Sequence, residues 1–221
     1  MRAVLALALG VWVIGAQAQL LQPPYTQGKQ YQVIAGAGKP AAGNSVVVHE
    51  FFWYGCPHCF RLDPMITSWV KTLPKGVVFQ RVPDSLGRQI GVVHEQAFYI
   101  AKQLGILAQT HAALFDAIHV EDRPMATLHE IRDLYVSVAG IDPGKFDAAS
   151  SSIAVQADVK QADDLAMRDR IDSVPTLVIG GYYKTNGVMA SSGHSDQSEA
   201  DSFKEMLKIA TYLVNKLQSG Q

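Results

Sequence analysis

The spacing of apolar positions predicts a strand, a helix and a second strand in the first half of the chain. Residues 46–54 form an apolar run rich in β-branched and aromatic side chains, which is typical of a strand buried on both faces. A helix should open at Cys56-Pro57, because proline is tolerated in the first helical turn. This helix continues past Pro64, which should kink it. A second strand is expected over residues 77–82.

Between about residues 88 and 164 the apolar positions have the period of amphipathic helices, and no strand pattern stands out. Thr127 and Glu130 have the spacing of a capping box at a helix start. Glycine at 105 and at 140 fits a helix end. The helices expected in this block cover residues 92–104, 110–118, 127–139, a segment that opens at 142, and 153–170.

Strand character returns at residues 176–179, and Gly180-Gly181 predicts a hairpin turn into a return strand. Residues 187–198 are polar and rich in glycine and serine, which predicts a loop. A final amphipathic helix is expected from about residue 199 to 217. This order of elements predicts an α/β protein with one sheet covered by helices, interrupted in sequence by a helical block.

The first residues have the pattern of an export signal. Met1-Arg2 is a short positive start, an apolar run follows, and Ala18 ends a small-x-small triplet, so residues 1–18 should be a cleavable signal peptide. The apolar run is too short to span a bilayer comfortably, which disfavours a membrane anchor. Residues 19–28 are expected to form a flexible leader, and residues 30–34 a short edge strand.

Composition adds two constraints. Hydrophobic residues make up 48% of the 221 residues, which is enough for a packed core and excludes a disordered chain. The chain has 19 basic and 20 acidic residues, so it offers no overall positive field for nucleic acid or an anionic membrane. We therefore expect no nucleic-acid partner.

The two cysteines, Cys56 and Cys59, are the strongest candidates for chemistry. A disulfide across a two-residue spacer removes little entropy from the unfolded chain, so the pair suits a redox centre better than a structural role. At a helix N-terminus, free N–H groups and the helix dipole favour a thiolate. We expect Cys56 to be the exposed sulfur that substrates attack and Cys59 to be the inner partner. A protonated His58 would stabilise the Cys56 thiolate further.

Other readings of the motif are weaker. Covalent haem attachment needs histidine after the second cysteine, where the chain has Phe60. Zinc would need paired histidine spacing, which the sequence lacks, so no metal is expected. Several aromatic residues at helical spacing should lie in the core, and the remaining polar candidates should lie on the surface. The expected core residues are Trp69, Phe98, Phe115 and Phe203. The expected surface residues are Arg61 and Asp63, and the expected surface or capping residues are His94, His111, His119, His129 and His194.

Residues 50–59, Glu-Phe-Phe-Trp-Tyr-Gly-Cys-Pro-His-Cys, resemble the active-site strand and helix start of the DsbA family of bacterial periplasmic disulfide oxidases. Residues 28–31 resemble the start of the mature DsbA domain, and the resemblance covers nearly all of residues 28–217. It implies a thioredoxin fold with an inserted all-helical domain. The implied thioredoxin-like domain is 29–87 plus 165–218, and the implied insertion is 88–164.

The resemblance also implies roles for three further residues. Pro175 precedes an expected strand, and by sequence alone a trans proline at a strand start is as good an interpretation as a cis proline facing the active site. The resemblance favours the cis form, with the Val174 backbone free to pair with an extended substrate. Glu50 would lie buried and unpaired beneath the active site, where it assists proton transfer to and from Cys59. An edge-strand glutamate facing solvent is the alternative.

The implied function is donation of the Cys56–Cys59 disulfide to reduced or unfolded exported proteins in the periplasm. Pro57, His58 and Glu50 would assist catalysis, and exposed apolar surface around Phe60 and Pro175 would bind substrate. The chain would be a monomer without cofactor, reoxidised by a quinone-linked membrane oxidase resembling DsbB. A disulfide reductase or isomerase and a redox-linked chaperone or peptide-binding protein are the alternatives. Isomerases of this superfamily carry an extra N-terminal dimerisation domain, which we do not expect here because only about ten residues of the expected mature chain precede Tyr31.

Overall fold

The computed structural model describes residues 23–41, 45–192 and 196–220. The expected signal peptide 1–18 and the first part of the leader lie outside the described residues. The elements, in chain order, are β1 Gln32–Val33, β2 Val46–Phe52, α1 Pro57–Val70, β3 Val77–Pro83, α2 Gln89–Gln103, α3 Leu107–His119, α4 Leu128–Ala139, α5 Pro143–Ser150, α6 Ile153–Arg168, β4 Thr176–Ile179, β5 Tyr183–Asn186, α7 Gly187–Ala190 and α8 Glu199–Gln218.

The strands form one mixed sheet in the order β1-β5-β4-β2-β3. β2 and β3 are parallel, in a register that places Glu50 opposite Arg81. β4 runs antiparallel to β2 and to β5, and β1 pairs antiparallel with β5 at the sheet edge. The central position of β2 explains its continuous apolar sequence, since both of its faces and both of its edges are covered.

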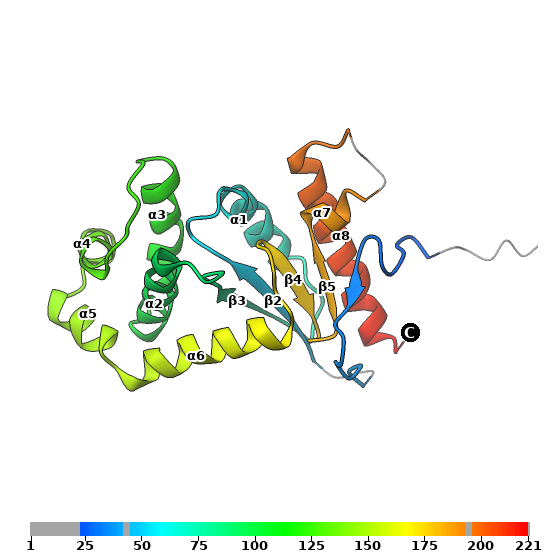
Figure 1. The fold of residues 1–221 in the computed structure, drawn as a ribbon, viewed down its shortest axis with the longest axis horizontal. Coiled ribbons are helices and arrows are strands. Elements are labelled where there is room, and N and C mark those ends of the chain that lie inside the picture. The colour runs from blue at the N-terminus through cyan, green and yellow to red at the C-terminus, as the bar shows by residue number, and fades with distance from the viewer. Residues whose placement is uncertain (1–22, 42–44, 193–195, 221) are drawn as a thin grey trace, which may run out of the picture.

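Side chains alternate between the two faces of the sheet, as strand geometry requires. Val48 of β2 and Leu177 of β4 pack on one face with α1 and α8, whereas Phe51 and Val178 pack with the helices of the insertion. Figure 1 shows α2 to α5 grouped to one side of the sheet and the long α6 returning from them to β4. The active-site helix α1 therefore packs on the same face of the sheet as α8, and its Phe60 also contacts α3 of the insertion.

Most expected elements are present. The capping box of Thr127 and Glu130 starts α4, and Gly140 ends it in the left-handed conformation. The loop expected over residues 187–198 is wrong at its start, where the one-turn helix α7 follows directly from β5. Asn186 caps that turn by accepting a hydrogen bond from Met189 N. A single helical turn leaves no periodic pattern in a sequence, so composition alone predicted a loop.

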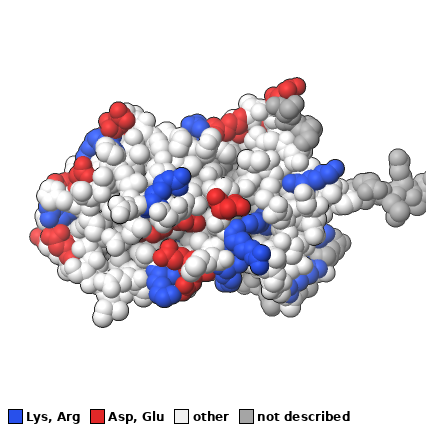
Figure 2. All heavy atoms as spheres, in the orientation of Figure 1, with Lys and Arg blue, Asp and Glu red and all other residues white. Residues whose placement is uncertain are grey.

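The expected core aromatics are buried, but the expectation of surface histidines is wrong at two positions. Trp69, Phe98, Phe115 and Phe203 are all 9% exposed or less. His94 of α2 and His111 of α3 are 1% and 8% exposed. Among the described residues no helix is long and apolar enough to cross a membrane. Figure 2 shows basic and acidic side chains interspersed over one face, in keeping with the balanced composition.

Candidate active site

Cys56 occupies the N-cap of α1, and Pro57 is the first helical residue, as the sequence predicts. The Cys56 Sγ accepts a hydrogen bond from Cys59 N at 3.4 Å, so the thiol sulfur takes the place of the usual capping oxygen. The Cys56 amide in turn donates to Trp53 O at 3.0 Å, which fixes the turn between β2 and α1. The first thiol therefore lies where the helix N-terminus favours negative charge.

Both cysteines are free thiols, and both are buried. Cys56 is 6% exposed and Cys59 is fully buried. The expectation of an exposed Cys56 is therefore wrong, although the order of burial is as expected. The residue before Pro175 covers the thiol, because Cys56 Sγ donates a hydrogen bond to Val174 O at 3.5 Å. This contact joins α1 to a loop that follows 118 residues later in the chain.

The two thiols have opposite proton affinities. A hydrogen bond from the Cys59 thiol, followed by backbone N–H groups of Cys59 and His58 and the charge of His58, lowers the pKa of Cys56 to about 6 even though burial opposes this. Burial, and then the neighbouring Cys56 sulfur, raise the pKa of Cys59 well above its usual value. At neutral pH the pair therefore holds a thiolate at Cys56 and a proton on Cys59.

His58 lies at the surface, with its imidazole directed to α8. Its Nδ1 forms an ion pair with the Glu199 carboxylate, and Arg61 Nη2 donates to the same carboxylate at 2.9 Å. Arg61 also forms an ion pair through its Nε. His58 acts on Cys56 through its backbone N–H and, more weakly, through its charge. The imidazole ring itself is held by Glu199, a partner that the sequence did not indicate.

The Val174–Pro175 peptide bond is cis, as the resemblance implied. Its loop borders a cavity of about 360 Å³ beside the motif. The walls come from the cis-proline loop, α7, α8 and the first turn of α1. The lining residues are His58, Ser173, Val174, Pro175, Asn186, Gly187, Val188, Ser191, Gln197, Glu199, Ser202 and Phe203. Val188 is 84% exposed at this site, so the cavity has an apolar rim.

Phe60 lines a different cavity, of about 290 Å³, together with Asp63. Its ring stacks on His119 with the ring centroids 4.8 Å apart and an angle of 17° between the planes. Phe60 is half-buried, so it offers less apolar surface than the sequence suggested. The contact joins the active-site helix to α3 of the insertion.

Glu50 is 2% exposed and lies in the middle of β2, which excludes an edge position facing solvent. Burial raises the pKa of its carboxyl to about 7, although the attraction of Arg81 works in the other direction. Its charge is close enough to the inner thiol to raise the pKa of Cys59. The expectation that Glu50 is unpaired is wrong, because Arg81 Nε lies 3.1 Å from its Oε2.

Three histidines of the insertion hold the residues that precede Cys56, and sequence reasoning missed all three. Trp53 Nε1 donates to His94 Nδ1 at 3.1 Å. The Tyr54 hydroxyl donates to His111 Nδ1 at 2.8 Å, and His119 Nε2 donates to Tyr54 O at 2.7 Å. The helical insertion thus fixes both residues in front of the motif. Trp53 and Tyr54 could have indicated such partners from the sequence, since buried indole and phenol groups need hydrogen-bond partners.

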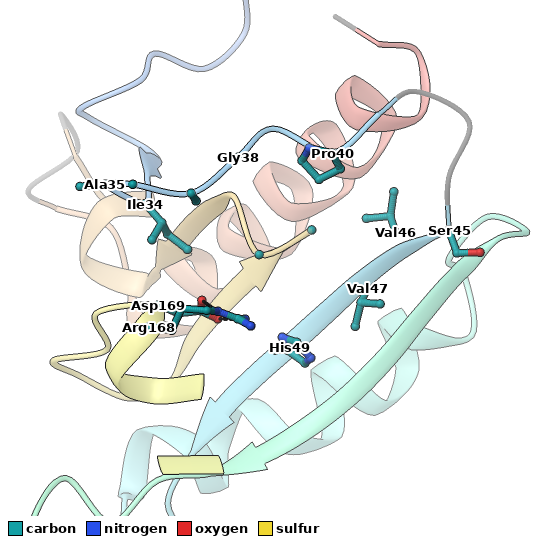
Figure 3. A pocket seen from close by; sticks show the side chains of 14 residues that line it. Ile34, Ala35, Gly38, Pro40, Ser45, Val46, Val47, His49, Arg168 and Asp169 are labelled. Carbon is teal, nitrogen blue, oxygen red and sulfur yellow. Dashed lines mark hydrogen bonds and ion pairs between the residues drawn. The ribbon is translucent and has the colours of Figure 1, made fainter. Parts of the chain in front are cut away.

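A larger cavity, of about 610 Å³, lies away from the thiols, between β2, the end of α6 and the segment that follows β1. Figure 3 shows His49, Arg168 and Asp169 around it, with apolar side chains such as Ile34 and Val47. No cysteine is among its lining residues. Within the described ranges, no group of three His, Cys, Asp or Glu residues is placed to hold a metal ion.

Comparisons with known proteins identify the family of the chain. Residues 75–203 match the family model of the DSBA-like thioredoxin domain. The chain is 35% identical over 192 residues to the thiol:disulfide interchange protein DsbA of Pseudomonas aeruginosa, covering 87% of this chain and 85% of that protein. It is 32% identical over 212 residues to the DsbA of Azotobacter vinelandii, covering 96% and 94%.

Solved structures show the same fold. The crystal structure of Pseudomonas aeruginosa DsbA superposes with a TM-score of 0.77 at 34% identity, covering 89% of this chain and 96% of that one. The oxidoreductase DsbA of Xylella fastidiosa superposes with a TM-score of 0.73 at 27% identity, covering 87% and 97%. The fold is therefore a thioredoxin fold with a helical insertion. With its Cys-Pro-His-Cys motif facing a cis-proline, the chain belongs to the DsbA family of thiol:disulfide oxidoreductases.

Proposed function

We propose that this protein donates the Cys56–Cys59 disulfide to reduced proteins in the periplasm. The observation that carries the proposal is the contrast between the two thiols, with the pKa of Cys56 lowered to about 6 and that of Cys59 raised well above its usual value. A stable Cys56 thiolate stabilises the reduced protein, so the disulfide becomes the stronger oxidant. Each unit of thiol pKa below ambient pH contributes about 1.4 kcal/mol, or roughly 30 mV.

The exchange runs in two balanced steps. A substrate thiolate attacks Cys56 Sγ of the oxidised protein, a mixed disulfide forms, and the electron pair of the Cys56–Cys59 bond leaves on Cys59, which takes a proton. A second substrate thiolate then attacks the substrate sulfur of the mixed disulfide. Cys56 leaves as a thiolate, and its low pKa makes it a good leaving group. The substrate ends oxidised and the dithiol ends reduced.

Glu50 is proposed as the proton donor to Cys59 in the first step and as the acceptor when the protein is reoxidised. Its raised pKa, about 7, suits both directions near neutral pH. Pro57 and His58 are proposed to support the Cys56 thiolate. Pro57 fixes the first helical turn, and His58 contributes its backbone N–H and its charge.

Substrate binding is proposed at the cis-proline loop. Val174 O already accepts a hydrogen bond from the Cys56 thiol, so an extended substrate that pairs with the Val174 backbone would lie directly against the reacting sulfur. Pro175 and the cavity beside it would take the neighbouring side chains. Phe60, which lines the cavity on the α3 side, completes the proposed substrate surface.

The cellular setting is part of the same proposal. Cleavage after Ala18 would release the mature protein into the periplasm, as the pattern of residues 1–18 indicates. The working partners would be reduced exported proteins and a quinone-linked membrane oxidase resembling DsbB, with the protein acting as a monomer. We divide the chain into a thioredoxin-like domain, 29–87 plus 165–218, and an insertion, 88–164. The grouping of α2 to α5 beside the sheet supports this division.

The test uses an oxidised protein and a reduced peptide with two cysteines. Wild type should oxidise the peptide in a stopped-flow assay, and Cys56→Ser should not. The matched variant Cys59→Ser should capture an oxidised peptide as a long-lived mixed disulfide through Cys56. Full peptide oxidation by Cys56→Ser would refute the proposed role of Cys56.

A further inference from the structure

Arg81 of β3 is held by two residues on one face of the active-site helix. Its Nη2 donates to Asp63 Oδ1 at 2.7 Å and to Thr67 Oγ1 at 2.9 Å. Asp63 and Thr67 are four residues apart in α1, so their side chains are neighbours on the helix surface. The guanidinium group therefore has its best hydrogen bonds toward α1.

The same guanidinium group lies beside Glu50 but does not bond to it well. Arg81 Nε is 3.1 Å from Glu50 Oε2, yet neither atom makes an aligned hydrogen bond to any described residue. An aligned pair of this kind would use two parallel N–H···O bonds. Glu50 therefore receives mainly the attraction of a nearby positive charge, and its hydrogen bonding with Arg81 is the smallest of the causes that act on its pKa.

Asp63 is itself anchored from the insertion. His111 Nε2 donates to the Asp63 Oδ1 atom at 3.1 Å, while His111 Nδ1 accepts from the Tyr54 hydroxyl. Although burial opposes ionisation, the hydrogen bonds from His111 and Arg81 lower the pKa of Asp63. Asp63 thus stays negative and fixed in place between α3 and β3. The sequence predicted a surface position for it, which is wrong, since its side chain is only 15% exposed.

The groups that face Glu50 come from each neighbouring element with an ionisable side chain near it. β3 contributes Arg81, α1 contributes Asp63 and Cys59, and the turn after β2 contributes Tyr54. β4 places Leu177 opposite Glu50 and adds no charge there. Arg81 lowers the pKa of Glu50 and Asp63 raises it. Asp63 therefore acts on Glu50 twice, by its own charge and by holding Arg81.

We propose that Asp63 is a positioning residue of the exchange reaction, which holds the Arg81 guanidinium toward α1 and so keeps Glu50 able to carry a proton for Cys59. Thr67 and His111 support it, the first by a second hydrogen bond to Arg81 and the second by fixing the Asp63 carboxylate. This inference rests on the proposed role of Glu50 as the proton carrier. It adds the reason why a carboxyl beside an arginine keeps its proton near neutral pH.

The experiment compares Asp63→Asn with the matched control Asp116→Asn. Asp116 lines the same cavity as Asp63, but it is exposed, and in the described part of the chain it forms no ion pair or hydrogen bond with Arg81. The reduced full-length protein is labelled with ¹³C at glutamate carboxyls, and the Glu50 resonance, assigned by its loss in Glu50→Gln, is titrated. Asp63→Asn should lower the Glu50 midpoint by about one pH unit, because a freed arginine within hydrogen-bond range lowers a carboxyl pKa by that order. Asp116→Asn should leave the midpoint unchanged.

A kinetic readout tests the same step. The rate at which a reduced peptide attacks the oxidised protein, divided by the peptide thiolate concentration, should fall as Glu50 loses its proton. This fall should occur at about one unit lower pH in Asp63→Asn. If Asp63→Asn does not fold, Thr67→Val removes the other anchor of Arg81 and should shift the midpoint in the same direction by a smaller amount.

The outcomes separate the two proposals. A rate profile that is unchanged in Glu50→Gln would refute the proton-carrier role itself. If the pH dependence of the rate is lost in Glu50→Gln but keeps its wild-type midpoint in Asp63→Asn, only the positioning role is overturned. A shift of equal size in Asp116→Asn would also overturn it, since any nearby negative charge would then suffice.

Discussion

Glu199, the first residue of α8, forms an ion pair with His58 of the active-site motif, although 141 residues separate them in the chain. Arg61 binds the same carboxylate, so one glutamate holds two residues of α1. The pair lies on the wall of the cavity beside Pro175. The C-terminal helix therefore helps to set where the histidine of the motif lies.

Glu199 should make a pH-dependent contribution to the stability of the fold. Arg61, and then His58, lower its pKa from 4.5 to about 2. Because the folded-state pKa is depressed, the contribution is present above about pH 4.5 and is lost as the pH falls through about 2. Above pH 5 the free energy of unfolding of the wild type should exceed that of Glu199→Gln by less than about 1 kcal/mol, since the ion pair is solvent-exposed. Urea unfolding of both proteins from pH 2 to 7 checks this, and a constant difference over that range would contradict it.

The Cys59 thiol should control the pKa of Cys56. The hydrogen bond from the Cys59 thiol is the largest cause of the lowered Cys56 pKa. Cys59→Ala should therefore raise the Cys56 midpoint above about 6. Thiolate absorbance at 240 nm, titrated in the reduced protein, measures it. An unchanged midpoint in Cys59→Ala would mean that the helix N-terminus alone stabilises the thiolate.

Substitution of His58 should shift the reduction potential of the Cys56–Cys59 pair. Its charge is the smallest of the causes that lower the Cys56 pKa, and its backbone N–H remains in any substitution. His58→Ser should raise the pKa of Cys56 and make the disulfide a weaker oxidant, by roughly 30 mV for each pKa unit. Equilibration with glutathione measures the potential. A more oxidising His58→Ser protein would contradict the sign.

Substitution of His111 should lower the stability of the fold. Its two ring nitrogens bond to the Tyr54 hydroxyl and to Asp63, and both His111 and Tyr54 are buried. His111→Leu would leave the Tyr54 hydroxyl buried without that acceptor, at a cost of about 1–3 kcal/mol. His129→Leu, at an exposed position of α4, is the matched control and should have little effect. Equal unfolding midpoints in urea for the two variants would refute the structural role of His111.

The sequence contained enough local information for most of the fold. The start of α1 at Pro57, the capping box of Thr127 and the glycine hairpin at 180–181 all depend on near neighbours in the chain, and all are confirmed. The resemblance supplied the cis form of Pro175. Whether a proline is cis depends on packing against distant segments, and sequence reasoning alone left it open.

The missed features all depend on strand register or on packing between segments that are distant in the chain. Arg81 meets Glu50 because β2 and β3 pair in one particular register, which an apolar run does not specify. His94 and His111 are polar residues on amphipathic helices, yet they are buried because Trp53 and Tyr54 supply hydrogen-bond partners. Cys56 is covered by a loop more than a hundred residues away in the chain, so its burial could not be predicted from the motif.

The reduction potential of the Cys56–Cys59 pair tests the account most directly. The protein from Gln19 onward would be equilibrated with glutathione buffers and its redox state measured by thiol alkylation. We expect a potential well above the glutathione poise of about −240 mV, because the Cys56 thiolate stabilises the reduced form. A potential near the thioredoxin value of about −270 mV would contradict it and would indicate a reductase.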